Sequence, residues 1–284
     1  MKKIILSADS TCDLPINLRE KLNIQIIPLY INLNGKEYRD SVDIFPDDIY
    51  NYYNEHKILP KTAAPSIGDF LEHFRKWDKE TYEIIHISIG SGISASYQNA
   101  TLAANELGNV YVVDSNSLTT GSSILLLKAD EFRQKGISAK EIYEHLRVLN
   151  KKVNASFVIN SLTYLREGGR LSALQAFGAN VLGIKPCIEV KNEKHGQMEV
   201  GNKYRGNLSK VHSKYTQDRL KDNSNIDTSR IFLTHSGISD ENIDFIKTEI
   251  EKYQQFDEII IARAGCTISS HCGENTIGLI YLDK

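Results

Sequence analysis

Three short segments of the chain carry side chains that could bind an anion or move a proton. They span residues 90–96, 166–172 and 269–275. Each places hydroxyl, imidazole or guanidinium groups beside glycine, which permits unusual backbone paths and the close approach of a ligand. Polar residues on loops that follow strands are common in binding clefts.

The first segment follows a predicted strand, 84–89, and reads Gly90-Ser91-Gly92-Ile93-Ser94-Ala95, which fits the dinucleotide-binding pattern G-x-G-x-x-A. Asp114 ends the next predicted strand, as the ribose-binding acid of that pattern does. An NAD-dependent oxidoreductase is therefore one alternative, although the pattern normally belongs to the first strand of its unit. The broader prediction is an anion site, because free amides and the helix dipole favour negative charge where a helix begins. Ser94 could also serve only to cap that helix.

Ser94 is also a candidate nucleophile. His86, His235 and His271 could each supply a base for it. The nucleophile elbow G-x-S-x-G is absent, because Ser96 stands where its second glycine would be. A serine acyl hydrolase is therefore a further alternative.

The other two segments supply an arginine and a histidine. Gly168 and Gly169 deliver Arg170 to the start of a predicted helix, and His271 lies among small residues on a predicted loop after a strand. Both side chains can face a cleft between lobes. The plainer alternatives are a salt bridge at a lobe junction for Arg170 and a structural role for His271.

The composition is that of a globular protein with room for two lobes. The 284 residues include 34 Lys and Arg against 36 Asp and Glu, and the net charge of −2 argues against a bulk nucleic-acid binder. No apolar run approaches the roughly 18–20 residues of a membrane span, and the run at 4–6 is too short for a secretion signal. We therefore expect a cytoplasmic protein, monomeric and not inserted in a membrane.

The cysteines are expected to be free thiols. Cys12, Cys187, Cys266 and Cys272 are dispersed, and none forms a C-x-x-C pair. Cys266, His271 and Cys272 lie close in sequence, but their spacing matches no usual zinc site. The sequence predicts no metal site.

The order of predicted elements indicates the fold class. Strands and helices alternate through the first half, which predicts a parallel sheet with helices on both faces. From about residue 155 the pattern changes, and residues 186–190 and 198–204 face each other across a polar turn as a hairpin. We expect a two-lobed α/β protein: a parallel α/β/α lobe at 1–153, and a mixed or antiparallel sheet with helices at 154–284.

Two local predictions bear on the site. Residues 25–33 are predicted as one strand that leads into a hairpin turn at Asn34-Gly35. Residues 60–66 are predicted as a loop, because a proline stands at each end.

Several segments together resemble the DegV family of bacterial fatty-acid-binding proteins, in the order in which that family carries them. The resemblance covers essentially the whole chain. The matching segments are Asp9-Ser10-Thr11-Cys12-Asp13-Leu14-Pro15, Thr62-Ala63-Ala64-Pro65-Ser66, Ser91-Gly92-Ile93-Ser94-Ala95-Ser96-Tyr97-Gln98-Asn99-Ala100, Val113-Asp114-Ser115, Arg166-Glu167-Gly168-Gly169-Arg170-Leu171-Ser172 and Ser270-His271-Cys272-Gly273.

The resemblance implies a lipid-binding protein that is not itself an enzyme and needs no cofactor. One long-chain fatty acid would lie buried between the lobes, and a separate kinase would convert its carboxylate to an acyl phosphate for lipid synthesis. Thr62 and Ser94 match the hydroxyls that hold the carboxylate. Arg170 and His271 match groups set just behind it. Arg205, with Lys203, is a candidate contact for the kinase.

The chain departs from the family pattern in three places. Ala63-Ala64 stands where Ser-Gln is common, and Ala95 replaces a glycine after Ser94. Both changes leave the two hydroxyls in place. Glu274-Asn275 replaces Pro-Gly after His271, which bears on the shape of that loop.

Overall fold

A parallel sheet forms the centre of the N-terminal lobe, as the alternation of elements predicts. The computed structural model describes residues 2–169 and 183–284. The strand order is β2-β1-β6-β7, and every neighbouring pair is parallel. The strands are β1 (Lys3–Asp9), β2 (Gln25–Ile27), β6 (Tyr82–Ser88) and β7 (Val110–Asp114).

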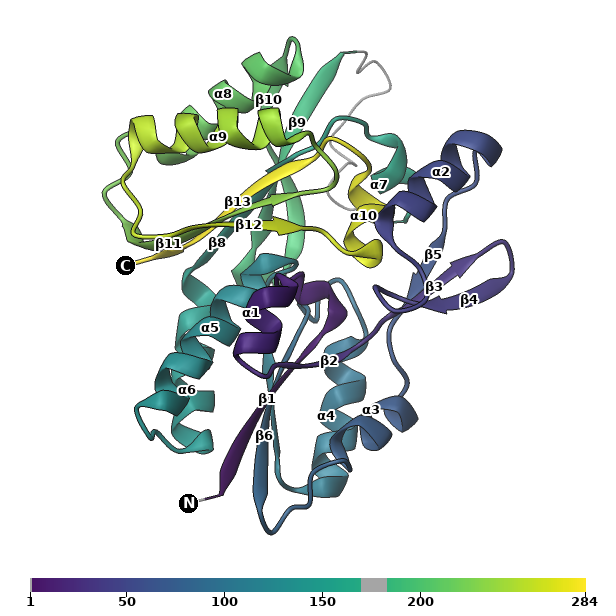
Figure 1. The fold of residues 1–284 in the computed structure, drawn as a ribbon, viewed down its shortest axis with the longest axis vertical. Coiled ribbons are helices and arrows are strands. Elements are labelled where there is room, and N and C mark those ends of the chain that lie inside the picture. The colour runs from purple at the N-terminus through teal and green to yellow at the C-terminus, as the bar shows by residue number, and fades with distance from the viewer. Residues whose placement is uncertain (1, 170–182) are drawn as a thin grey trace.

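Helices cover both faces of this sheet (Figure 1). Phe70 and Phe74 of α3 and the alanines of α4 pack on one face, while α5 and α6 pack on the other. The apolar residues of these helices recur at three- and four-residue spacing, which turns one face of each helix to the sheet. The helices are α1 (Ile16–Lys21), α3 (Ile67–Phe74), α4 (Ser96–Leu107), α5 (Thr120–Gln134) and α6 (Ala139–Leu149).

A mixed sheet forms the C-terminal lobe and confirms the predicted fold class. Its order is β10-β9-β8-β13-β11-β12, antiparallel except for the pair β11 and β12. Its strands begin at Val153, and the predicted boundary near that residue stays a prediction. The strands are β8 (Val153–Val158), β9 (Ile184–Lys191), β10 (Gln197–Arg205), β11 (Ile226–His235), β12 (Ile259–Arg263) and β13 (Ile277–Asp283).

Both faces of the mixed sheet are covered. Leu279 and Tyr281 of β13 pack toward α8 (Leu208–Leu220) and α9 (Asp240–Tyr253), whereas the alternate residues Ile280 and Leu282 join the core shared with α5. This alternation follows from the two-residue period of a strand. The sheet therefore presents its second face to the N-terminal lobe.

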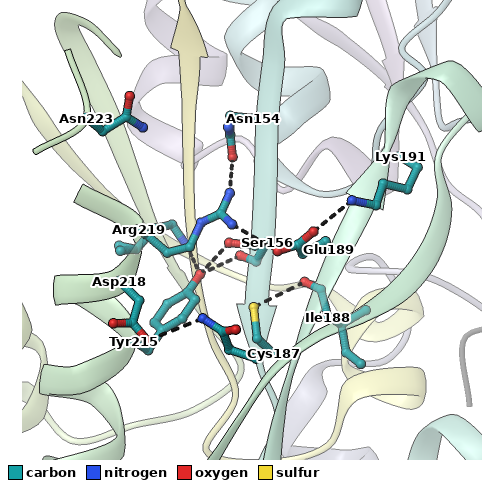
Figure 2. A network of polar contacts seen from close by, with 12 residues as sticks. Asn154, Ser156, Cys187, Ile188, Glu189, Lys191, Tyr215, Asp218, Arg219 and Asn223 are labelled. Atoms are coloured by element: carbon teal, nitrogen blue, oxygen red, sulfur yellow. Dashed lines mark hydrogen bonds and ion pairs between the residues drawn. The ribbon is translucent and has the colours of Figure 1, made fainter. Parts of the chain in front are cut away.

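A polar network fixes α8 on the outer face of this sheet (Figure 2). The Tyr215 hydroxyl donates to Ser156 O at 2.8 Å and accepts from Leu279 N at 3.0 Å, so it joins β8 to β13. Arg219 pairs with Glu189 of β9 at 3.2 Å and also bonds Asn154. These bonds satisfy buried polar groups that would otherwise cost stability.

A small third sheet, with the strand order β4-β3-β5, projects beside the two lobes together with the helix α2 (Pro46–His56) (Figure 1). This sheet and α2 pack on α7 (Thr163–Glu167) and α10 (Cys266–Cys272). Its strands are β3 (Tyr30–Leu33), β4 (Lys36–Arg39) and β5 (Lys61–Ala63). The turn at Asn34-Gly35 is confirmed. The single strand predicted at 25–33 is wrong, because Pro28 has no N–H for the ladder and separates β2 from β3. We call residues 30–63, which carry this sheet and α2, the arm.

Candidate ligand-binding site

A largely apolar pocket lies where the arm and the two lobes meet. Its wall is mainly apolar with a few polar side chains, as is usual for small-molecule sites. Ala155, Phe157 and Ile280 line it from the inner face of the mixed sheet. Its other lining residues are Leu29, Thr62, Ala63, Ala64, Ile89, Ile93, Ser94, Leu118, Thr119, Ser156, Leu165, Met198, Thr234, His235, Ser236, Ala264, Thr267, Ile268, His271, Cys272, Thr276 and Gly278.

Thr62 reaches this pocket from β5, so the loop predicted at 60–66 is wrong in its first half. Thr62 pairs with Ile31 of β3, which places its half-buried side chain at the inner edge of the arm. Its Oγ1 lies 2.9 Å from His271 Nε2. Two of the predicted site residues are therefore in direct contact.

His271 lies in the last turn of α10, not on the predicted loop. Its ring packs against Gly168, where an added Cβ would lie 2.3 Å from His271 Nδ1. The helix ends at Gly273, whose φ of 71° suits glycine, and Asn275 has a φ of 61°. Asparagine tolerates this left-handed region better than most residues, so the chain turns here without the family glycine.

Two buried carboxylates hold the other end of α10, and sequence reasoning missed both. Asp40 of the arm accepts hydrogen bonds from Cys266 N at 2.8 Å and Thr267 N at 3.1 Å. Asp13 accepts from Gly265 N at 2.8 Å, and burial, opposed by its hydrogen bonds, raises the pKa of this carboxyl to about 8. An acid before a helix start is a recognisable signal, but here the acids are distant in sequence.

Ser94 faces the pocket from the turn before α4. Its Oγ accepts a hydrogen bond from Ser96 N at 3.1 Å, while the helix itself begins at Ser96. The N-cap residue is Ala95, and Ser94 supports the start of the helix only through the Ser96 amide. Among the described residues the Ser94 hydroxyl hydrogen has no acceptor, so it remains available to an anionic ligand.

Other hydroxyls of the pocket are turned into the protein. Thr119 donates to Asp13 at 2.5 Å, Thr267 donates to Asp40 at 2.7 Å, and Thr276 donates to Cys272 O at 2.9 Å. Burial raises the pKa of the Cys272 thiol to about 12, so it stays neutral. The pocket thus combines a mainly apolar wall with the hydroxyls of Thr62 and Ser94 among its lining residues.

The remaining predicted site residues are Arg170, Lys203 and Arg205. Arg170 lies outside the described residues. Lys203 and Arg205 lie near the end of β10 and do not line the pocket. Together with Lys210 and Lys214 of α8, they border a separate shallow depression that carries mainly positive charge.

The geometry disfavours the two enzymatic alternatives. The space next to the Gly90-Ser91-Gly92 turn holds carbonyl groups of the β9–β10 hairpin, and Asp114 accepts from Ser91 N at 3.1 Å and Ser91 Oγ at 2.5 Å. A pyrophosphate would meet carbonyl oxygens there instead of free amides. Within the described residues, Ser94 has no histidine in hydrogen-bonding distance, as an activated nucleophile would need.

The residues grouped earlier as a possible metal site do not form one. The Cys266 thiol bonds Ile44 O, and His271 contacts Thr62. Within residues 2–169 and 183–284, no three His, Cys, Asp or Glu side chains converge as metal ligands would. In the same ranges no helix combines the length and apolar character of a membrane span.

The fold and the pocket define a two-lobed α/β protein with a largely apolar pocket between its lobes. The model of the family described as "Uncharacterised protein, DegV family" matches residues 3–284. The chain therefore belongs to the DegV family. A DegV domain-containing protein of Clostridium acetobutylicum is 34% identical, with 100% of both chains covered.

Solved structures of the family resemble this one over its whole length. A fatty-acid-binding DegV protein from Thermus thermophilus has a TM-score of 0.88 at 30% identity, covering 99% of this chain and 100% of its own. A DegV protein from Eubacterium eligens, loaded with heptadecanoic acid, has a TM-score of 0.83 at 26% identity over 99% and 100% of the two chains. DegV proteins with bound fatty acids are thus known.

Proposed function

We propose that this chain binds one long-chain fatty acid in the pocket between its lobes. The observation that carries the proposal is the pocket itself, which has a mainly apolar wall and is lined by the hydroxyls of Thr62 and Ser94. The fatty acids of the structural relatives support it. The carboxylate accepts hydrogen bonds from Thr62 and Ser94, and the chain extends along the apolar wall.

The bound acid is then presented to a separate kinase in the cytoplasm. A carboxylate oxygen attacks the γ-phosphorus of ATP on the kinase, a P–O bond to the acyl group forms, and the bond to ADP breaks. Neutral hydroxyls leave the carboxylate nucleophilic, whereas a bidentate arginine would occupy its lone pairs. The protein itself acts as a monomeric carrier without a cofactor, and the acyl phosphate enters lipid synthesis.

Arg170 and His271 are assigned to this transfer by their family positions. Arg170 would stabilise charge on the transferred phosphoryl group, as cationic groups do in phosphoryl transfer. The contact between His271 and Thr62 supports a position just behind the carboxylate. The positive depression at Lys203 and Arg205 suits an acidic surface of the kinase.

The ligand is tested by denaturing the purified protein, extracting it with organic solvent and identifying the extract by mass spectrometry. A fatty acid at near-equimolar yield is expected. A dinucleotide would overturn the proposal in favour of an oxidoreductase. An extract with neither compound would count against a bound fatty acid and leave the hydrolase open.

The transfer is tested with Arg170→Ala, assayed for fatty-acid content and for kinase-dependent acyl-phosphate formation. Retained acid with lost turnover is expected. Unchanged turnover would remove Arg170 from the transfer step, and a parallel loss of acid and thermal stability would assign it to bracing the lobes.

A further inference from the structure

The tip of the β9–β10 hairpin rests on the turn that leads to Ser94. Gly92 N donates a hydrogen bond to His195 O at 2.8 Å. A Cβ added to Gly90 would lie 2.6 Å from His195 O, and one added to Gly92 would lie 2.8 Å from Lys194 O. The turn needs glycine at both positions because a backbone segment from the other lobe lies directly against it.

The hairpin is shaped for the same contact. Gly196 has a φ of +85°, and a Cβ there would lie 3.2 Å from Gly90 Cα. His195 has a φ of 54° and directs its Nδ1 to within 3.2 Å of Asn116 Oδ1. Two backbones therefore meet through glycines, with one imidazole at the margin of the contact.

Asp114 joins the turn to the hairpin tip. Besides its two hydrogen bonds from Ser91, its carboxylate accepts from Asn116 N at 2.9 Å, and Oδ2 lies 3.6 Å from His195 Nδ1. Its side chain is mostly buried. Hydrogen bonds to an ionised acceptor are strong, so this carboxylate is a firm anchor for the turn.

Both sides of this contact continue into the pocket. Ser94 follows Gly92 by two residues, and Met198 follows Gly196 by two residues; each lines the pocket. A displacement of the hairpin tip would therefore move an anchoring hydroxyl and part of the apolar wall together.

We infer that residues 192–196 form a clasp, which positions the Ser94 turn and thereby sets how fast the ligand leaves. The inference rests on the proposed fatty-acid site. His195 and Gly196 act through the turn without touching the ligand, so they are positioning residues. Gly90 and Gly92, which fit the dinucleotide-binding pattern, thus allow the backbones of the two lobes to lie in contact.

The test compares palmitate release from the full-length protein into an excess of fatty-acid-free albumin. Gly90→Ala forces the clasp away from the turn, and release at least tenfold faster is expected. His195→Asn keeps a residue that tolerates positive φ but removes the imidazole, so a smaller acceleration is expected. Gly68→Ala in α3 is the matched control, because its Cβ would meet only Ser66 Oγ at 3.5 Å.

A double-mutant cycle with Ser94→Ala separates positioning from general destabilisation. If the clasp acts through Ser94, Gly90→Ala adds little to the release rate of a Ser94→Ala protein. Fully additive effects would overturn the inference. If the parent protein holds no palmitate, the proposed function and the clasp are both refuted. If the parent protein holds palmitate but Gly90→Ala and His195→Asn release it at the parent rate, only the clasp is refuted.

Discussion

Thr62 Oγ1 and His271 Nε2 lie 2.9 Å apart although 209 positions separate the two residues in sequence. Thr62 comes from the arm and His271 from α10, whose opposite end is held by Asp40 of the same arm. The arm therefore contacts α10 at both ends. A hydroxyl placed in this way before a ligand arrives loses little entropy on binding.

The two anchoring hydroxyls should each matter for retention of the acid. Thr62→Val and Ser94→Ala each remove one hydrogen bond to a charged group, worth roughly 1.5–3 kcal/mol. We expect each variant to bind palmitate at least tenfold more weakly, and the double variant to lose it on purification. Isothermal titration with delipidated protein measures the effect.

Thr248→Val is the matched control for this experiment, because Thr248 lies on the exposed side of α9 and donates only to Asp244 O. It should bind as the parent does. Parent-like affinity in the double variant would place the carboxylate elsewhere in the pocket.

The apolar wall should dominate affinity. Eight methylenes at about 0.8 kcal/mol each represent roughly 6 kcal/mol of gross transfer free energy. Ordering of the chain reduces this gain. We expect an eight-carbon acid to bind at least 100-fold more weakly than a sixteen-carbon acid in a competition assay. Equal affinity would mean that the chain does not lie in the pocket.

Gly168→Ala should disturb the acid's surroundings through steric clashes of the new Cβ. The φ of Gly168 is −71°, which alanine adopts readily, but the new Cβ would lie 2.3 Å from His271 Nδ1 and 2.9 Å from Tyr164 O. The imidazole must therefore leave its present position beside Thr62. We expect weaker palmitate binding with a smaller change in Tm than in affinity. A parent-like affinity would show that the His271 position is unimportant for the acid.

Asp13 should make the protein less stable as pH rises. Its folded-state pKa of about 8 lies above its ordinary value of 3.8, so the folded state holds a proton that the unfolded state has released across the pH range between them. The isosteric Asp13→Asn variant lacks this loss. At 1.36 kcal/mol per pH unit between the two pKa values, its unfolding free energy relative to the parent should rise by about 3 kcal/mol from pH 5 to pH 7.

Urea unfolding at the two pH values measures this difference, and comparison of the two proteins cancels the contributions of other titrating groups. A difference in unfolding free energy that stays constant with pH would show that Asp13 is ionised in the folded protein.

Local sequence patterns predicted the elements that form through interactions between residues close together in the sequence. The hairpin turn predicted at Asn34-Gly35 joins β3 to β4, which pair up to Leu33 and Lys36 on either side of it. The strand β5 escaped prediction because its partner β3 is distant in sequence and the flanking prolines indicate a loop. Pairings between distant segments leave no periodic signal in either segment.

Sequence comparison with the family found the polar side chains that line the pocket, but it did not find the carboxylates that hold α10 in place. Family resemblance identified Thr62, Ser94 and His271, which all line the pocket. Asp13 and Asp40 were missed because their partners are backbone amides at the start of α10. Almost every residue has such an amide, so the sequence does not show which one a side chain will bond. The roles of the hydroxyls stay predictions until they are tested.

The strand that carries Thr62 has only three residues and lies at the edge of its sheet. Short edge pairings open more often than the centre of a sheet, so amide hydrogens here should exchange with deuterium sooner than those of β6. The Thr62 hydroxyl thus lies on β5, one of the strands expected to open more easily. Occupancy of the pocket could then be followed as slower exchange at the amides of β5, with no label on the ligand.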